Sequence, residues 1–352
     1  MSLNWKQLLE MNTEDFVGLD IGSFSVKMIQ LQKNESGFSI VAAGKADIDY
    51  PLTEEDPDGR DKAAVKAIND CFKSANSGAQ LTVCSLCGPE VAVRPFKFPS
   101  LPQEEIQGAI MLEAAQVCPF NFSDSVVDYQ LLSSGNDGMR GVLVAATDRL
   151  IRKKQSLAEQ AGRKAALIDV DGLAMLNCLK EWTNVQQGKT IAALNVGNSY
   201  TTLAIIGAEN LPFIRDIAYA GQNIIEKLAP NLAVEPVALH KMFSAGQISA
   251  EYQSKIAENL SLACQRLVDD ISETLRYYAA SEKTFVEEIY LCGGFAIIDG
   301  FADLLKTRFT ADVKLWNPFE NVSDRIAPHC RDFLKKQGPA MAVAAGLAMR
   351  QL

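Results

Sequence analysis

The clearest alternation of hydrophobic and polar positions near the start of the chain runs from Phe16 to Leu31 (FVGLDIGSFSVKMIQL). An apolar run ends at Asp20, a turn of small residues follows, and the alternation then resumes. This pattern predicts two strands joined by a Gly/Ser turn. Such a turn can present backbone N–H groups to a phosphate, Lys27 would add a positive charge, and Asp20 could hold Mg²⁺ through water. A hairpin without a ligand would show the same residue types.

A second stretch repeats this pattern 175 positions later, from Ile191 to Ile206 (IAALNVGNSYTTLAII). The residues that coincide at this offset are Asn195 with Asp20, Gly197 with Gly22, Ser199 with Phe24 and Thr202 with Lys27. A repeat of this length in a chain of 352 residues predicts two related halves. Two such hairpins, one from each half, imply a nucleotide held in a cleft between them.

Short apolar strands and amphipathic helices follow one another along the rest of the chain, which is typical of an α/β fold. In the first half we expect strands at 38–48, 81–86 and 165–170 and helices at 62–74 and 172–183. Between them, a strand, a helix, two strands and a helix over 91–161 indicate an inserted α+β module. In the second half we expect a largely helical region at 223–282, a strand at 285–292, a helix at 301–308 and a buried apolar helix at the end of the chain.

The composition narrows the class of protein. Apolar residues make up 48% and charged residues 22% of the chain, as in ordinary globular proteins. The net charge of −9 and the lack of a basic tract argue against nucleic-acid binding. No apolar run approaches the length of a transmembrane helix and the start lacks a signal-peptide core, so we expect a cytoplasmic protein. Cys84 and Cys87 lie three apart on an expected strand and so point to opposite faces, which is a poor arrangement for a metal site.

The order of these elements resembles the actin/Hsp70/sugar-kinase ATPase fold. Asp20-x-Gly22 resembles its first phosphate motif, Asn195-x-Gly197 occupies the second, and residues 291–300 (LCGGFAIIDG) resemble its adenosine motif. There a Gly pair lets the backbone approach the nucleotide closely. The resemblance implies an α/β, actin-like and ribonuclease H-like two-lobed ATPase fold with an inserted α+β subdomain in the first lobe.

Within that fold the chain resembles the PilM family, the actin-like component of type IV pilus assembly and a relative of FtsA. The signals are DIGSFSVKMIQL, the EAA-x-x-x-PF pattern at Glu113 to Phe120, Asp128-Tyr129 and the closing AVAAGLAMR, and the resemblance spans roughly 14–350. It implies four subdomains. In the first lobe, the core (1A) covers 14–90 and is completed by 167–187 and 338–352, and the inserted subdomain (1C) covers 91–166. In the second lobe, the core (2A) covers 188–222 and is completed by 283–337, and the helical subdomain (2B) covers 223–282.

The resemblance also implies ligands. ATP or ADP with Mg²⁺ would lie between the lobes, with Asp20 holding the metal through water. The nucleotide-binding residues would be Asp20, Gly22, Ser23, Phe24, Ser25, Lys27, Asn195, Gly197, Asn198, Ser199, Gly221, Thr274, Gly293, Gly294 and Phe295. No catalytic residue is assigned.

A partner is implied as well. The cytoplasmic N-terminal tail of a PilN-like inner-membrane protein would dock in a groove between the first-lobe core and the inserted module, so the protein would be cytoplasmic and peripheral at the inner membrane. The groove would involve Ile106, Ile110, Glu113, Val117, Pro119 and Phe120. Pilus motor or platform proteins and weak self-association are further expected contacts, and nucleic acid is not.

The chain departs from the family pattern at two places. Relatives usually begin the second phosphate motif with Asp, and here it is Asn195, which lacks the charge that orients Mg²⁺ or attacking water. Relatives often carry Arg-Arg before Ser in the helix facing adenine, and here Ser272 and Glu273 stand at those places. Since losing a group that positions water typically costs about 10²–10⁴ in rate, we expect weak or structural nucleotide binding and slow or absent hydrolysis.

Three functions remain open at this stage. The first is a scaffold of a type IV pilus or a related type II secretion complex. The second is an active ATPase or small-molecule phosphotransferase of the same superfamily, for which Asp169, Asp171 or Asp216 would have to serve as the base. The third is an FtsA-like membrane-attached filament protein, which would need an amphipathic C-terminal helix that we do not find in the sequence. A fold alone does not decide among them.

Overall fold

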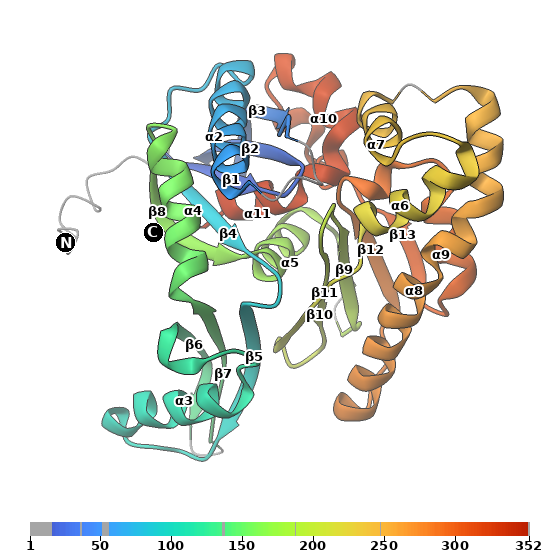
Figure 1. Cartoon of the computed structure of the whole chain (residues 1–352). Coiled ribbons are helices and arrows are strands. Elements are labelled where there is room, and N and C mark those ends of the chain that lie inside the picture. Colours follow the sequence, from blue (N-terminus) through green and yellow to red (C-terminus); the bar gives the residue numbers. More distant parts are fainter. Residues whose placement is uncertain are drawn as a thin grey trace. The chain divides into compact units, whose positions relative to one another are not determined.

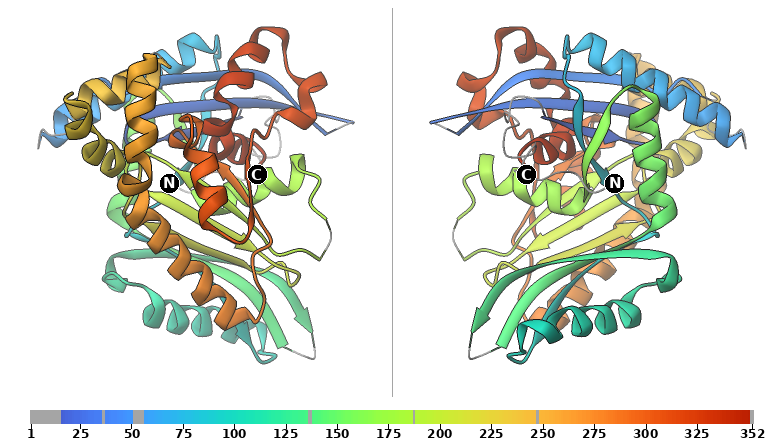
Figure 2. Two further views of the ribbon diagram at one scale, coloured as in Figure 1. Left: turned by 90° about the vertical axis from the view of Figure 1, so that its right-hand side faces the viewer. Right: turned by 90° about the vertical axis from the view of Figure 1, so that its left-hand side faces the viewer.

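The computed structural model describes residues 16–35, 37–50, 56–135, 138–186, 188–246 and 248–350. The chain forms two compact units. The first unit holds the described residues up to Leu86, Arg152–Asn184, and those from Asn317 onward. The second unit holds Cys87–Ile151 and Val185–Trp316. Figures 1 and 2 show the course of the chain in three views.

The first unit is built on a five-stranded sheet of order β3-β2-β1-β4-β8 (Figure 1). Its strands are β1 (Phe16–Ile21), β2 (Ser25–Asn34), β3 (Gly37–Asp47), β4 (Leu81–Leu86) and β8 (Lys164–Val170). The first three pair antiparallel, and β1, β4 and β8 pair parallel. Its helices are α2 (Pro57–Ser74), most of α4 (Asp148–Gln160), α5 (Asp171–Trp182), α10 (Arg331–Gln337) and α11 (Ala342–Ala348). The short 3₁₀ segments Glu320–Arg325, Pro328–Cys330 and Gly338–Met341 complete it.

The second unit contains a sheet of the same design, of order β11-β10-β9-β12-β13. Its strands are β9 (Ile191–Val196), β10 (Thr201–Ile206), β11 (Pro212–Ile217), β12 (Glu288–Cys292) and β13 (Asp312–Leu315). Again three strands pair antiparallel before two parallel pairings follow. Its helices are α6 (Gly221–Leu232), α7 (Pro236–Ala245), α8 (Ala250–Glu282) and α9 (Phe301–Arg308), and a 3₁₀ segment covers Phe295–Ile297. The shared strand order supports the repeat seen in the sequence.

The inserted module was expected in the first lobe, but its residues up to Ile151 group with the second unit, where the module's first strand packs beside β11. The module has its own sheet and core. Its elements are β5 (Val91–Phe98), α3 (Gln103–Val117), a 3₁₀ segment Phe122–Asp124, β6 (Ser125–Gly135) and β7 (Gly138–Thr147). The sheet has the order β5-β7-β6, and α3 packs on one of its faces (Figure 2). The buried side chains between them are Phe96, Ile106, Ile110, Ala114, Met139 and Leu143.

The C-terminal helix α11 is buried in the first unit, as the sequence predicted. It contacts α5 and β1, and all of its residues up to Leu347 are buried. Two glycines allow this close packing. A Cβ on Gly18 of β1 would collide with the Ala344 carbonyl oxygen, and one on Gly346 would collide with the backbone of Ala174. The small residues of α11 therefore serve backbone approach within a core, not contact with a membrane.

Some boundaries differ from the expected ones for local reasons. Helix α2 begins at Pro57, five residues before the predicted start, because the Asp56 carboxylate accepts from Gly59 N–H at 3.1 Å and caps the helix. Residues 51–55 and residues 14 and 15 of the expected core lie outside the described residues. Helix α10 and strand β13 were not predicted.

The grouping of the chain also differs from the expected domain division. Residues 317–337 were assigned to the second-lobe core, whereas they group with the first unit. Ala327 N–H donates to the Ile40 carbonyl at 2.9 Å, and Asn321 Nδ2 donates to the Trp182 carbonyl at 3.1 Å. Residues 87–90, expected in the first-lobe core, group with the second unit, where Gly88 N–H donates to Asp216 Oδ2 at 2.6 Å.

Candidate functional site

The first candidate site is the turn between β1 and β2. Gly22 N–H donates to the Ser25 carbonyl at 3.1 Å and closes the turn. Gly22, Ser23 and Phe24 are half-buried and Ser25 is buried. The strand register places Asp20 directly opposite Lys27, and Lys27 Nζ lies 2.8 Å from Asp20 Oδ2. The two side chains that the sequence assigned to Mg²⁺ and to phosphate thus bind each other in this structure.

The Asp20–Lys27 ion pair is shielded from solvent. The side chains are 13% and 11% exposed. Burial by itself would lower the pKa of Lys27, but the charge of Asp20, its hydrogen bond and the charge of Asp171 together raise the pKa above its usual 10.5. Lys27 is therefore a permanent cation at neutral pH whose charge is already compensated.

Two further cations reach this turn, and sequence reasoning missed both. Lys154, on α4, donates from Nζ to the Ile21 carbonyl. Arg60, on α2, donates to the Ser23 carbonyl at 3.4 Å. They lie more than thirty positions from the turn, so no local motif could have identified them; only the packing of α2 and α4 beside β1 and β2 brings them there. The turn is consequently more electropositive than its own sequence indicates.

The buried carboxylates of the first unit are already engaged. Asp169, at the end of β8, lies 2.8 Å from Arg350 Nε and is 5% exposed. Burial raises the pKa of this carboxyl, and Arg350 opposes the rise. Asp171 begins α5 and is also buried. Asp169 is thus placed as a structural ion pair partner and not as an exposed base.

The turn between β9 and β10 repeats the geometry of the first turn. Gly197 N–H donates to the Tyr200 carbonyl at 3.1 Å, and Asn195 lies opposite Thr202 as Asp20 lies opposite Lys27. The start of α6 joins this turn, because Gly221 N–H donates to the Gly197 carbonyl at 3.0 Å. Ser199 is half-buried at its tip. The repeated turn, Asn195, Gly197 and Gly221 therefore come together within one unit.

A histidine from α7 also reaches the second turn. His240 Nε2 lies 2.7 Å from Asn198 Oδ1, and because that oxygen only accepts, the hydrogen bond requires the proton on Nε2. Asn198 in turn lies beside α6, where its carbonyl accepts from Gln222 N–H at 2.9 Å. No sequence signal pointed to His240, since it lies 42 residues from Asn198.

The predicted adenosine motif lies at the end of β12. Gly293 has φ +102°, and a Cβ there would lie 2.5 Å from Asn195 Oδ1, so only glycine fits against the second phosphate motif. Gly294 is exposed, whereas Phe295 is 5% exposed and packs edge-on against Phe301. Gly294 thus lies at the surface of the motif, and Phe295 belongs to the core.

Thr274 is placed differently from the other predicted residues. It is 1% exposed, and its hydroxyl donates to the Asp270 carbonyl at 2.8 Å within α8. Thr274 and Phe295 are therefore core residues, and the candidate site does not include them. Ser272, one of the two departures from the family pattern, likewise donates to the Val268 carbonyl at 2.7 Å.

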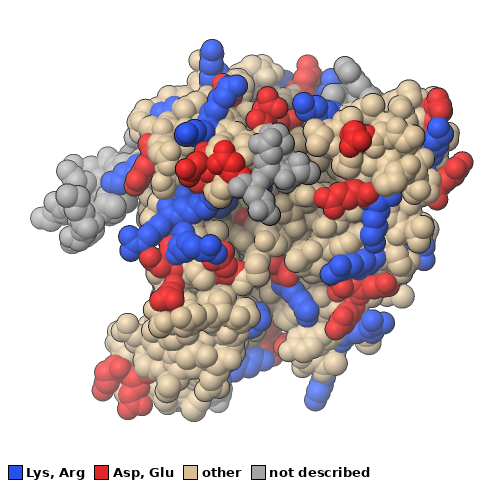
Figure 3. Space-filling model, in the orientation of Figure 1, with Lys and Arg blue, Asp and Glu red and all other residues tan. Residues whose placement is uncertain are grey.

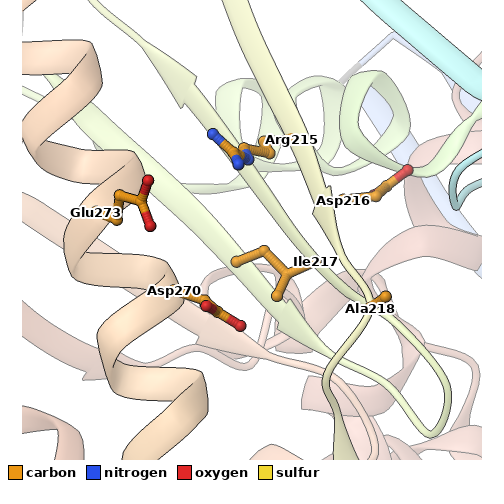
Figure 4. A pocket seen from close by; sticks show the side chains of 6 residues that line it. All are labelled: Arg215, Asp216, Ile217, Ala218, Asp270 and Glu273. Atoms are coloured by element: carbon orange, nitrogen blue, oxygen red, sulfur yellow. The ribbon is translucent and has the colours of Figure 1, made fainter. Parts of the chain in front are cut away.

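A shallow hollow of about 180 Å³ separates β11 from α8. It is lined by Arg215, Asp216, Ile217, Ala218, Asp270 and Glu273. Figure 4 shows Asp216 directed away from Asp270 and Glu273. Its carboxylate accepts from Gly88 N–H and from the Thr202 hydroxyl, both at 2.6 Å, and burial raises its pKa. Asp216 thus links Gly88, which precedes the module, to Thr202 of the second hairpin. Because its carboxylate is engaged in both bonds, Asp216 is poorly placed as a base.

The predicted partner residues of the module divide into buried and exposed sets. Ile106 and Ile110 are 7% and 1% exposed and form the module core; Glu113, Val117 and Phe120 are half-buried, and Pro119 is exposed. The exposed large apolar side chains are others, which sequence reasoning missed: Met111, Leu112, Val126, Tyr129, Leu131 and Leu132. Alternation along β6 could have pointed to the four on that strand only once its partner strand was known, and Met111 and Leu112 lie on α3.

Two classes of site are not seen in the part of the chain that the structure describes. No group of three or more His, Cys, Asp or Glu side chains there is arranged to hold a metal ion. Among the same residues, no helix has the length and apolar character needed to cross a membrane.

Comparison with known proteins places the chain in a family. A solved PilM–PilN type IV pilus biogenesis complex matches with a TM-score of 0.81 at 21% identity, covering 96% of this chain and 98% of that one. Ethanolamine utilization protein EutJ from Carboxydothermus hydrogenoformans matches with a TM-score of 0.56 at 11% identity, over 95% of this chain and 88% of EutJ. At these identities the solved structures establish the fold, and they confirm the predicted actin-like α/β ATPase fold.

The sequence comparisons agree. Cell division protein FtsA of Streptococcus pneumoniae serotype 2 (strain D39 / NCTC 7466) is 22% identical over 354 residues, covering 86% of this chain and 75% of FtsA. The model of the type IV pilus assembly protein PilM family matches residues 18–352. The chain therefore belongs to the type IV pilus assembly protein PilM family.

Proposed function

We propose that this protein is a cytoplasmic scaffold of a type IV pilus or related type II secretion assembly complex. In this proposal it binds the cytoplasmic N-terminal tail of a PilN-like inner-membrane protein and is held at the membrane by that partner. The observation that carries it is the concentration of exposed apolar side chains on the inserted module, six of them on α3 and β6. A soluble monomer rarely exposes such a group of side chains unless it is a binding surface.

A nucleotide is the second ligand in this proposal. ATP or ADP with Mg²⁺ would contact the turns Gly22–Ser25 and Gly197–Ser199 together with Asn195, Gly221, Gly293 and Gly294. The repeated turn geometry and the cations Lys154 and Arg60 support phosphate binding. We propose that hydrolysis is slow or absent, because Asn195 supplies no carboxylate and Asp20 is neutralised by Lys27.

The alternative function, an active ATPase or phosphotransferase, requires a carboxylate that accepts a proton. Asp169 is paired with Arg350, and Asp216 accepts two hydrogen bonds. Neither arrangement favours the alternative over the scaffold, and we do not adopt it.

The partner half of the proposal is tested by calorimetry of the purified chain with a synthetic peptide of the PilN-like tail from the same genome. We expect saturable binding that is weakened by Leu112→Glu or Leu131→Glu. Leu262→Glu is the matched control, because Leu262 is 73% exposed on α8, outside the module. Absence of binding, or equal loss with the control, would contradict the proposal.

The nucleotide half is tested by titrating the chain with ATP·Mg²⁺ and with ADP while measuring phosphate release in the same samples. Binding with little release supports a structural or regulatory nucleotide. Rapid release that is lost in Asp20→Ala would instead identify an ATPase, and no binding would remove the nucleotide from the proposal.

A further inference from the structure

The module's three-stranded sheet has two edges with different surroundings. On one side, β5 lies beside β11 of the same unit, and Ala92, Val93 and Phe96 are buried. On the other side β6 is the last strand of the sheet among the described residues, since the order is β5-β7-β6. An edge strand of eleven residues with apolar side chains is a ready template for another strand.

The exposed side chains of β6 lie on both faces of the strand. Tyr129 and Leu131, 37% and 36% exposed, share the face of Val127, which packs against the module core. Val126, 48% exposed, lies on the opposite face. A docked strand would cover both sets at once, whereas a helix lying on one face would cover only one of them.

The backbone of β6 shows where pairing would occur. Tyr129 N–H is bonded to the carboxylate of its neighbour Asp128, at 2.8 Å. That amide therefore points away from β7, and by alternation the amide of Val127 points the same way. The Asp128 carboxylate thus accepts from an N–H group, that of Tyr129, to which the carbonyl of an incoming strand would otherwise bind.

The charge around this edge selects the kind of partner. Helix α3 carries Glu104, Glu105 and Glu113, strand β6 carries Asp128, and neither element contains Lys or Arg. On the other two strands, Lys97 of β5 and Arg140 of β7 are both paired with Glu209, at 2.9 and 3.2 Å, and Arg94 of β5 donates to the Val93 carbonyl at 3.0 Å. Figure 3 shows the visible face over α3 as mostly uncharged, with acidic side chains at its outer end. A second copy would bring acid against acid, so charge complementarity favours a cationic partner.

We propose that the edge of β6 binds an extended peptide segment that alternates apolar and basic residues, as a fourth strand of the module's sheet. On binding, Tyr129 N–H passes from the Asp128 carboxylate to a carbonyl of the incoming strand, and Asp128 pairs with a basic side chain of that strand. This deepens the proposed function, on which the identity of the partner rests, and it assigns the chemistry of the surface.

The test uses two synthetic eight-residue peptides with the purified full chain, one alternating Lys and Val and one alternating Glu and Val. Fluorescence anisotropy should show saturable, salt-sensitive binding of the Lys peptide at least tenfold tighter than that of the Glu peptide. Hydrogen exchange should show new protection at the amides of Val127 and Tyr129. Equal binding of both peptides, or protection elsewhere without β6, would overturn the inference.

Three variants complete the test. Tyr129→Pro removes the outward amide without removing a bond to β7, and Asp128→Asn keeps the acceptor while removing the charge. We expect at least a tenfold loss for the first and a reduced salt dependence for the second, with Leu262→Lys unchanged. Circular dichroism checks the fold of each variant, and Asp128→Asn carries the test if Tyr129→Pro unfolds. A dimer at high concentration that Tyr129→Pro abolishes would show that a second copy takes the edge and would overturn the inference.

The inference and the proposed function can fail separately. If the PilN-like tail binds and neither β6 variant changes its affinity, the scaffold proposal stands and the β6 inference falls. If the Lys peptide binds at β6 and the tail does not bind at all, the reverse holds.

Discussion

The turns after β1 and after β9 close with the same bond, from a glycine N–H to the carbonyl three residues later, at 3.1 Å in both. Their flanking side chains differ. The first turn is flanked by a shielded Asp20–Lys27 ion pair, and the second has uncharged Asn195 and Thr202 at the same register positions. The comparison teaches that backbone geometry alone maintains the repeated turn, so the side chains beside it were able to take different roles in the two units.

The largest expected effect comes from breaking the first turn's ion pair. Lys27→Met should lower the free energy of unfolding by about 3–5 kcal/mol, because it leaves the shielded Asp20 carboxylate without its partner. Chemical denaturation measures the change. Lys33→Met is the control, since Lys33 is exposed on the same strand. A loss below about 1 kcal/mol would mean that the pair is no more stabilising than a surface salt bridge.

The next effect tests whether the missing charge in the second turn limits hydrolysis. Asn195→Asp should raise phosphate release from ATP·Mg²⁺ by about 100-fold, the lower end of what a water-positioning group contributes. A coupled phosphate assay measures the rate, with Asn210→Asp, at an exposed position after β10, as the control. An unchanged rate would show that the missing carboxylate at Asn195 does not limit hydrolysis.

A smaller effect is expected at the second turn, where Thr202 occupies the position that Lys27 has in the first. Thr202→Val should reduce the free energy of unfolding by about 1–2 kcal/mol, because the Asp216 carboxylate loses one of its two hydrogen bonds. Thr307→Val, at an exposed site on α9, should change stability by less than about 0.5 kcal/mol. Equal effects of the two substitutions would show that the hydrogen bond from Thr202 to Asp216 does not stabilise the second hairpin.

The stability of the protein should depend on pH in different ranges through Lys27 beside the first turn and Asp216 beside the second. Because the pKa of Lys27 is raised in the folded state, its contribution to the free energy of unfolding is complete below pH 10.5 and is lost as the pH rises further. The raised pKa of Asp216 means that the folded protein binds the proton more tightly than the unfolded chain, so its contribution falls as the pH rises from 3.8. Unfolding of the wild type and of Asp216→Asn between pH 4 and 7 should therefore show the wild type losing stability relative to the variant. A constant difference would contradict this, and Asp303→Asn, on the surface of α9, is the control.

Sequence pattern alone located most elements because the signals are local. Strand β4 and helix α9 begin and end at the predicted residues, since alternation and helical spacing are set within each segment. The repeat at an offset of 175 also predicted two related halves, because the same turn chemistry recurs in both, and the structure adds that their sheets share one strand order.

Side-chain contacts between distant segments were decided by tertiary structure. No pattern near Gly22 indicates that Lys154 and Arg60 reach its turn, or that His240 binds Asn198. On α3, Ile106 and Ile110 were expected in a groove and instead fill the module core, while Leu112, two residues on, is 68% exposed.

The physical reason is that periodicity shows that one face of an element is buried, but not which neighbour covers it. The same limit applies to the edge of β6, whose apolar residues became a candidate surface only when the sheet order left that strand without a second partner among the described strands. Local chemistry in the sequence thus determined the elements, the repeated turns and the family. Only the assembly of those elements decided which charges pair, which apolar side chains form the core and which remain available to bind.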